Sequence, residues 1–228
     1  MKKLFILAAA FVTALAISSC GKSSDDDTIQ YADDGETPMP EAVDLGLSVK
    51  WASFNLGASN EYDAGDYYAW GETKTKYNYT WGTYLYNNDN PASLPKAKDV
   101  ARKKLGDGWR MPTKAEIQEL VDTVEDDDYQ WKAETYKNKE GDEILKGWRV
   151  TSRRGSTKGN NIFLPAAGFM HSVLGYYGNT GFYWSSTLDE GTQITAFLLK
   201  FSFEEDTIVL ANDSTRSYGL SIRPVYVD

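Results

Sequence analysis

The sequence is poor in the residues that most often carry redox and metal chemistry. Its 228 residues include one cysteine and one histidine. A single cysteine excludes an intrachain disulfide, a Cys-X-X-Cys redox pair and a thiolate zinc site, and a single histidine excludes metal cages built from several imidazoles. Cations are also in deficit, with 24 Lys and Arg against 33 Asp and Glu. Because phosphate backbones are bound by clustered cations, we expect no nucleic-acid partner.

Long hydrophobic runs are absent after the first twenty residues, and the composition is that of a soluble globular chain. Hydrophobic residues make up 41% and charged residues 25%, and the formal net charge is −9. The length corresponds to one domain, or at most two. Aromatic residues are abundant at 14%, with 15 Tyr and 7 Trp.

The N-terminus carries a targeting signal. Lys2 and Lys3 precede an apolar stretch over residues 4–17, which is shorter than the about 20 residues that a membrane-spanning helix needs. The pattern predicts a secretory signal peptide over residues 1–19. The small residues before Cys20 resemble the lipobox of bacterial lipoproteins, which implies that Cys20 is acylated and anchors the chain in a lipid bilayer. The alternative is a plain signal peptide followed by an incidental cysteine.

Residues 20–41 are predicted to form a flexible acidic tether. The segment is rich in Ser, Asp, Gly, Thr and Pro and contains the run Asp25–Asp27, so it lacks the apolar surface that would offset the entropy of ordering it. Acidic residues soon after the cysteine resemble the signal that sends some lipoproteins to the outer face of the outer membrane. We therefore expect an outward-facing chain at the cell outer membrane. The alternative is a solvated linker on the periplasmic side.

The folded domain is predicted over residues 42–228. Thr113 and Glu116 form a capping box that begins a helix over residues 114–123, and three- to four-residue apolar spacing predicts a short helix within residues 94–105. Alternating polarity and turn residues predict strands and hairpins elsewhere. These cover residues 43–51, 129–151, 161–165, 183–187, 196–210 and 219–227.

Two segments concentrate aromatic residues in loops. Residues 62–86 contain nine Tyr or Trp without helical spacing, which fits either a stacking surface for sugar rings or a loop-rich core. We favour the core for this segment. Residues 171–182 form a glycine-rich aromatic loop, and we assign ligand contact to this second segment.

Six blocks of sequence, in order, resemble one bacterial family. They are Ala42 to Ala52, Trp70 to Thr73, Trp109 to Thr113, Phe163 to Gly168, Tyr183 to Thr187 and Ser221 to Val225. The chain resembles the "major paralogous domain" (FISUMP) family of exported lipoproteins, which is similar in turn to C-type-lectin-like domains. The resemblance implies an α+β, C-type-lectin-like fold with antiparallel strands, one or two flanking helices and long irregular loops. It also implies that a strand near Val49 pairs with the last strand near Val225.

Two departures from related families limit the chemistry. Calcium-dependent lectins present carboxylate and carboxamide ligands where this chain has Trp184-Ser185-Ser186, and calcium takes about six to eight oxygen ligands, so we expect no metal. The block from Arg110 to Glu116 resembles the formylglycine-generating enzymes, whose chemistry depends on cysteines. The mature chain would have none besides the acylated Cys20, so we expect neither that activity nor a cofactor.

These observations favour a surface-anchored lipoprotein that binds a ligand or mediates adhesion without being an enzyme. The predicted ligand contacts are His171, Tyr176, Tyr177, Asp189 and Glu190, and the ligand would be a glycan or a surface protein. His171 alone is more typical of a polar loop than of a catalytic base. One alternative is a structural or accessory subunit of a surface assembly such as a fimbrial tip. Another is a glycosidase with two carboxylates.

Overall fold

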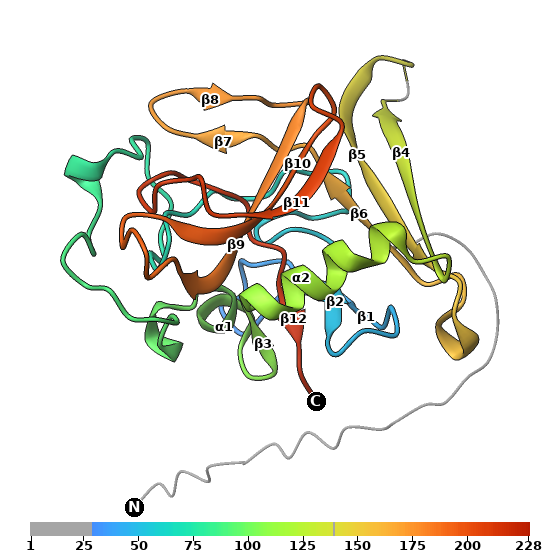
Figure 1. Cartoon of the computed structure of the whole chain (residues 1–228), viewed down its shortest axis with the longest axis horizontal. Coiled ribbons are helices and arrows are strands. Elements are labelled where there is room, and N and C mark those ends of the chain that lie inside the picture. The colour runs from blue at the N-terminus through green and yellow to red at the C-terminus, as the bar shows by residue number, and fades with distance from the viewer. Residues whose placement is uncertain (1–28, 139) are drawn as a thin grey trace, which may run out of the picture.

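The structure, a computed structural model, describes residues 29–138 and 140–228. The predicted signal peptide, Cys20 and residues 21–28 of the predicted tether lie outside the described residues. Strands account for 34% and helices for 14%, so the chain is an α+β protein of small antiparallel sheets (Figure 1). The expected α+β class is therefore confirmed.

Early and late segments of the domain meet in one sheet. β1 (Ala42–Val43), β2 (Lys50–Ala52), β12 (Val225–Tyr226) and β3 (Trp109–Arg110) lie in the order β1-β2-β12-β3, and all neighbours are antiparallel. Val225 pairs with Trp51. This contact confirms the predicted pairing of the early strand with the last strand, and it closes the domain across its length.

Two three-stranded antiparallel sheets and one short hairpin make up the remaining strands. One sheet has the order β4-β5-β6 and the other the order β11-β10-β9, so β4 and β11 are edge strands. The bounds are β4 (Tyr129–Lys137), β5 (Glu143–Ser152), β6 (Asn161–Pro165), β9 (Thr180–Leu188), β10 (Ala196–Ser202) and β11 (Thr207–Ala211), with β7 (Phe169–Met170) and β8 (Leu174–Gly175) as the hairpin. The hairpins predicted over residues 129–151 and 196–210 are confirmed.

The longer helix, α2 (Lys114–Asp122), begins where its capping box predicts. The Thr113 hydroxyl accepts a hydrogen bond from the Glu116 amide, and the Glu116 carboxylate accepts one from the Thr113 amide. The carboxylate also forms a bidentate ion pair with Arg110, and its pKa is lowered because these hydrogen bonds outweigh the opposing effect of burial. α2 lies across the β9–β11 sheet, burying Ile117 and Leu120 (Figure 1).

The second helix, α1 (Val100–Leu105), is shorter than the predicted span. A 3₁₀ turn, η2 (Lys96–Lys98), precedes it, and the Asp99 carboxylate then caps the helix by accepting a hydrogen bond from the Arg102 amide. The same carboxylate accepts from the Met111 amide and so ties α1 to β3. Three further 3₁₀ turns are described: η1 (Trp81–Thr83), η3 (Thr123–Glu125) and η4 (Gly155–Thr157).

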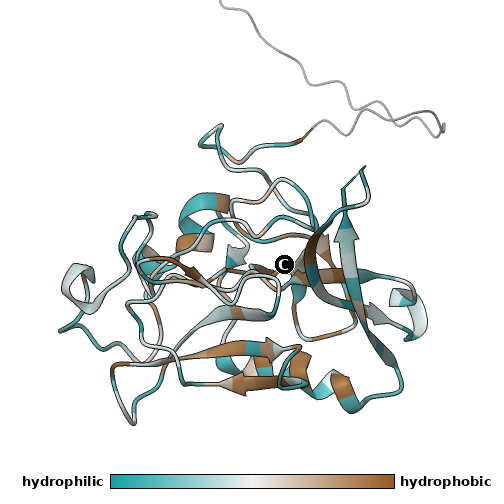
Figure 2. Cartoon of the chain, turned by 90° about the horizontal axis from the view of Figure 1, so that it is seen from above, coloured by the Kyte–Doolittle hydropathy of each residue, from teal (hydrophilic) through white to brown (hydrophobic). Residues whose placement is uncertain are grey.

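Tryptophan and tyrosine side chains fill much of the core. Trp184 is fully buried, and its indole nitrogen donates a hydrogen bond to the Tyr68 carbonyl at 3.0 Å. Trp70 donates likewise to the Ser185 carbonyl at 2.9 Å. Several rings of residues 62–86 are buried, which agrees with the core interpretation of that segment, although Tyr77 is 99% exposed. Figure 2 shows the hydrophobic colour concentrated on several strands and the loops mostly hydrophilic.

The prediction of a single strand over residues 43–51 is wrong. The chain forms two short strands, β1 and β2, joined by a loop. The Asp44 carboxylate accepts a hydrogen bond from the Gly46 amide, and Gly46 adopts a φ of +80°. This local turn competes with strand pairing, so the alternating Val43, Leu45 and Leu47 do not lie on one face of a strand.

Ordered packing begins about ten residues before the predicted domain boundary, because residues 29–41 of the expected tether lie against the domain. Ala32 and Thr37 are buried, and the Asp34 carboxylate accepts hydrogen bonds from the Thr37 amide and hydroxyl. These hydrogen bonds hold the pKa of Asp34 well below its usual range. Lys104 of α1 forms an ion pair with the same carboxylate at 3.6 Å.

The C-terminal segment is less regular than predicted. Within residues 219–227, the paired strand is β12 alone, and isolated bridges join Leu220 to Tyr68 and Gly219 to Met170. Pro224 lacks the N–H that a continuous ladder requires. The segment instead runs through the middle of the domain, touching the early loops and the β7–β8 hairpin in turn.

Candidate functional site

The β7–β8 hairpin carries the predicted ligand-binding loop, and a glycine makes its folded shape possible. Gly168 has a φ of +66°, and a Cβ there would overlap the carbonyl oxygen of Gly175 and lie 2.8 Å from the Tyr177 amide nitrogen. Only a residue without a side chain allows this close return of the backbone. The return places Tyr176, itself at a φ of +57°, beside Phe169.

Four rings from this hairpin and from residue 218 form what we call the aromatic ladder: Tyr176, Phe169, Tyr218 and His171. The Tyr176 and Phe169 ring centres are 5.8 Å apart at 26°, and those of Phe169 and Tyr218 are 5.1 Å apart at 12°. His171 meets Tyr218 edge to face at 5.2 Å. Buried Phe182 packs edge-on against Phe169. The rings are therefore held in place by one another.

Two hollows open on either side of Tyr218. The His171 hollow, about 430 Å³, is lined by His171, Tyr218, Trp81, Ile194, Thr215 and Ser217. The Tyr176 hollow, about 260 Å³, is lined by three rings of the ladder and by polar side chains from the start of β9, from β10, from the β10–β11 turn and from the loop after β11. These polar residues include Asn179, Lys200, Glu204, Glu205 and Asp213. The ladder thus separates an apolar hollow from a polar one.

The polar hollow contains a fixed ion pair. The Lys200 ammonium donates to the Asp213 carboxylate at 2.8 Å, and this hydrogen bond raises the pKa of Lys200. The ammonium also lies 5.9 Å from the centre of the Phe182 ring. Hydrogen-bonding groups are therefore held next to ring surfaces, which is the usual construction of a site for a polar ligand with apolar faces.

The structure brings two of the predicted ligand contacts together and separates the others. His171 and Tyr176 both belong to the ladder, and Tyr176 is 61% exposed. Tyr177 is not one of the ladder rings: burial raises its pKa, and the charge of nearby Asp63 adds to the shift. Among the described residues, the hydrogen-bonding partner of the His171 ring is the Ser172 hydroxyl, at 3.4 Å.

Asp189 is used inside the fold, whereas the neighbouring Glu190 is exposed. The Asp189 carboxylate accepts hydrogen bonds from Gly191, Thr192, Thr195 and Asn212. Burial raises the pKa of this carboxyl, but the hydrogen bonds lower it further, so the net shift is downward. Asp189 therefore shapes the turn that carries Ile194 into the His171 hollow, and its oxygens are already engaged.

A buried arginine packs against Trp81, one of the residues that line the His171 hollow. Arg216 has no exposed surface, and its guanidinium carbon lies 5.4–5.8 Å from the ring centres of Trp70, Trp81 and Tyr84. Its terminal nitrogens donate to the Asp89 carbonyl and the Asn90 side chain, each at 2.9 Å. Sequence reasoning missed this cluster and Tyr218, since no local pattern indicates that distant loops converge here.

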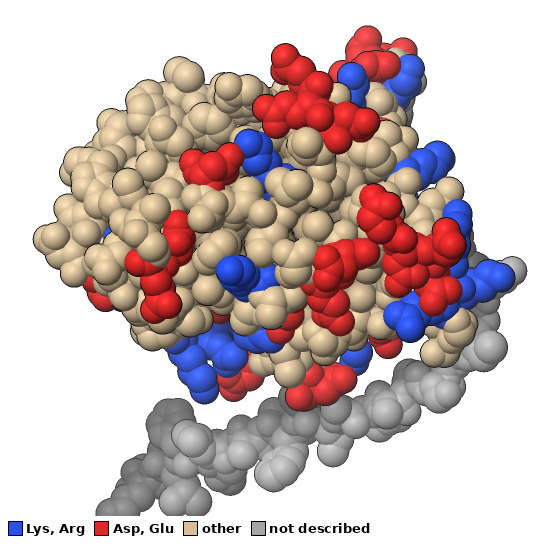
Figure 3. Space-filling view, in the orientation of Figure 1, with Lys and Arg blue, Asp and Glu red and all other residues tan. Residues whose placement is uncertain are grey.

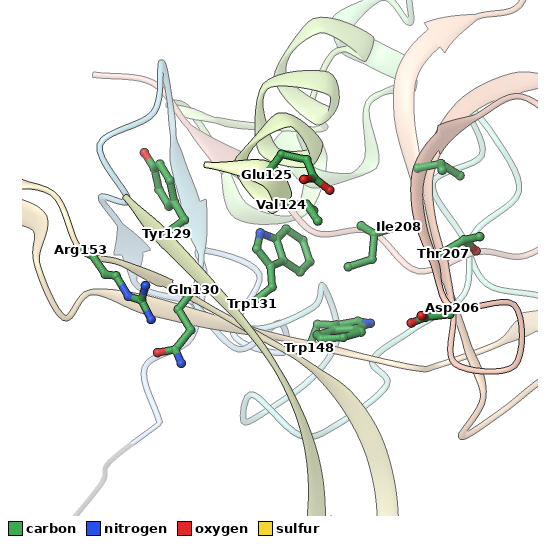
Figure 4. Close-up of a pocket in the computed structure, with 11 residues that line it drawn as sticks. Val124, Glu125, Tyr129, Gln130, Trp131, Trp148, Arg153, Asp206, Thr207 and Ile208 are labelled. Carbon is green, nitrogen blue, oxygen red and sulfur yellow. The ribbon is translucent and has the colours of Figure 1, made fainter. Parts of the chain in front are cut away.

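A larger groove lies in another part of the fold. We call it the Trp groove: a cavity of about 610 Å³ between the β4–β5 hairpin and β11. Figure 4 shows Trp131 and Trp148 on one side and Ile208 on the other. The sequence did carry a signal for it, because both tryptophans stand on the facing strands of a predicted hairpin.

Comparisons of the chain with protein-family models, with curated proteins and with solved structures found no match. None of the helices in residues 29–138 and 140–228 is long and apolar enough to span a membrane. Within the same described part of the chain, no group of three or more His, Cys, Asp or Glu side chains is arranged to hold a metal ion.

Proposed function

We propose that this chain is a lipid-anchored, outward-facing outer-membrane protein that binds glycans without transforming them. The aromatic ladder with its two hollows is the observation that carries the proposal. Sugar rings present apolar C–H faces and polar hydroxyl edges, so they are recognised by ring surfaces next to fixed hydrogen-bonding groups. The Tyr176 hollow combines both kinds of group within one site.

The absence of a catalytic role is part of the same proposal. In the described residues, the ring nitrogens of His171 have no carboxylate hydrogen-bonding partner, whereas a catalytic histidine is usually oriented by an acidic group. The carboxylates of Asp189 and Asp213 are held by hydrogen bonds within the protein. These carboxylates are therefore suited to shape the site rather than to exchange protons with a substrate.

The finer fold assignment also belongs to the proposal. We propose a C-type-lectin-like arrangement, supported by the pairing of β2 with β12, by the two short helices and by the irregular loops between the sheets. In such an arrangement a small rigid scaffold presents variable loops. The β7–β8 hairpin and the loop around Tyr218 would then be the ligand-binding loops.

Glycan binding is tested with the full chain in detergent on a glycan array, followed by calorimetry with the best soluble hit. We expect Tyr176→Asn to bind about tenfold more weakly, since truncating an anchoring ring costs roughly 1 kcal/mol or more. Asparagine tolerates the positive φ of this position. Tyr77→Asn is the matched control, because Tyr77 is exposed and outside the ladder. Absence of glycan binding by the folded chain, or equal binding by Tyr176→Asn, contradicts the proposal.

Anchoring is tested separately in cells that process lipoproteins. We expect the chain to incorporate an alkyne-labelled fatty acid and to partition into detergent, and we expect Cys20→Ser to lose both properties. Protease added to intact cells should degrade the wild-type chain if it faces outward. Lipidation without protease sensitivity would instead favour the periplasmic side.

One observation favours the alternative, an accessory subunit of a surface assembly. β4 and β11 are edge strands whose outer sides have no partner strand in the described residues. Open edges of this kind accept strands from other chains. Co-purification of stoichiometric partner chains with the solubilised full-length protein would support this alternative.

A further inference from the structure

The Trp groove has walls that are fixed before any ligand arrives. The Trp148 ring stacks on Phe203 at 5.3 Å and 19°, and the Trp131 ring meets Trp148 edge to face at 6.3 Å. The Trp131 indole nitrogen donates to the Thr123 hydroxyl at 2.9 Å, and that hydroxyl donates to the Leu120 carbonyl at 2.7 Å. The apolar wall is therefore preorganised, which lowers the entropy cost of binding.

The opposite wall is an open strand. Thr207, Ile208 and Val209 of β11 line the groove, and β11 pairs with β10 on one side while its other side has no partner strand in the described residues. An edge strand presents a row of backbone N–H and C=O groups that can continue the sheet. Val209 is 40% exposed, so the open edge also presents apolar surface.

The rim of the groove is acidic. Glu125 and Asp206 line it, exposed Asp126 and Asp127 follow Glu125 at one end, and Glu204 and Glu205 precede Asp206 at the other. The next residue, Asp128, is paired with Arg154 at 3.3 Å. Acidic side chains gather over the β10–β11 connection and near the C-terminal end of α2 (Figure 3). Arg153 is the one cation among the lining residues. This distribution disfavours polyanions and a second copy of this acidic chain, and it favours a cationic occupant.

We propose that the Trp groove docks an extended, cationic polypeptide segment that adds as a strand to β11. The open edge would supply backbone hydrogen bonds, the two tryptophans would cover alternate apolar side chains of the segment, and the acidic rim would pair with its Lys or Arg residues. This site is separate from the aromatic ladder, so it stands whether or not the ladder binds glycans.

The test uses the full chain in detergent and three labelled nine-residue peptides. One alternates Lys and Val, one alternates Glu and Val, and one is the Lys–Val peptide with a central Pro. Fluorescence anisotropy measures binding, and hydrogen exchange measures protection of the β11 amides. We expect the Lys–Val peptide to bind and to protect β11. We expect the other two peptides to bind at least about tenfold more weakly, since one reverses the charge and the other cannot donate along the edge.

Matched charge variants distinguish peptide binding at the groove from general attraction to an acidic protein. Glu125→Gln combined with Asp206→Asn should weaken Lys–Val peptide binding about tenfold and reduce its salt dependence. Asp33→Asn combined with Glu36→Gln removes the same charge from an exposed turn elsewhere and should leave binding within about twofold. Tyr176→Asn should also leave it unchanged.

Three results would overturn the proposal. They are no binding of the Lys–Val peptide, equal binding of the proline-containing peptide, and binding without protection of β11. Displacement of the peptide by a soluble glycan that is insensitive to Tyr176→Asn would assign the groove to sugars instead. If the ladder binds no glycan, the peptide experiments still test the groove, because the two sites are assayed with different ligands.

Discussion

The substitution Gly168→Ala tests how much of the candidate site depends on one backbone turn. At a φ of +66° an alanine is in the left-handed region, which costs about 1–2 kcal/mol. Its Cβ would also overlap the Gly175 carbonyl oxygen and approach the Tyr177 amide nitrogen to 2.8 Å. Both obstacles are backbone atoms, so the β7–β8 hairpin must move to relieve them.

The movement separates Phe169 from its stacked neighbours, Tyr176 and Tyr218. Each aromatic pair contributes about 0.5–1.5 kcal/mol beyond its buried area, so the total loss of unfolding free energy is about 2–5 kcal/mol. For a domain of this size, each 1 kcal/mol lowers Tm by about 2–4 °C. We therefore expect Tm to fall by roughly 4–20 °C, and we expect the near-ultraviolet circular dichroism of the ladder rings to weaken.

Gly178→Ala is the control within the same loop. Gly178 has a φ of +77°, but no atom lies within 4 Å of the position that its Cβ would take. This variant should show the backbone cost of about 1–2 kcal/mol alone and retain the aromatic circular dichroism signal. If the two variants lose the same stability, or if Gly168→Ala keeps the signal of the stacked rings, the steric reasoning is refuted.

Three further substitutions probe the scaffold. Glu116 has a pKa below its usual 4.5, so its ion pair with Arg110 stabilises the fold fully above about pH 4.5. This stabilisation is lost as the pH falls through the lowered pKa. Urea titrations between pH 3 and 6 should show that Glu116→Gln lacks this acid-dependent loss of stability. Arg216→Met leaves the Asp89 carbonyl and the Asn90 side chain without this donor and removes the cation beside three aromatic rings. The denaturation midpoint should therefore fall by an amount equivalent to about 2 kcal/mol, and an unchanged midpoint would contradict the role of this cluster. Asp189→Ala removes the acceptor of four hydrogen bonds and should lower stability by about 2 kcal/mol in thermal unfolding, whereas exposed Glu190→Ala should change it by less than about 0.5 kcal/mol.

Elements with local signals were predictable from the sequence. The start of α2 follows from Thr113 and Glu116, because the capping box is formed by residues three apart. The strand predicted over residues 43–51 fails for an equally local reason. The hydrogen bond from the Gly46 amide to the Asp44 side chain outweighs the alternation of apolar residues, and the periodicity alone does not reveal that competition.

The candidate site was predictable in part. Tyr176 and His171 were identified because they lie in one aromatic loop, but Tyr218 comes from a segment about forty residues later and becomes their neighbour through the bridge between Met170 and Gly219. Such pairing depends on topology, which the sequence pattern does not specify. The internal role of Asp189 had a usable signal, since an aspartate with a glycine two residues later and a threonine three residues later favours a side-chain-capped turn.

The two candidate surfaces share one structural element. Lys200 and Ser202 of β10, with Glu204 and Glu205, line the Tyr176 hollow, while Asp206 and the first residues of β11 line the Trp groove. The turn between β10 and β11 therefore borders both sites. A cationic segment held at Asp206 would offset part of the negative charge of Glu204 and Glu205 beside the hollow. Coupling between two binding sites is reciprocal. If the bound segment changes the affinity of the hollow for its ligand, that ligand must change the affinity of the groove for the segment by the same factor.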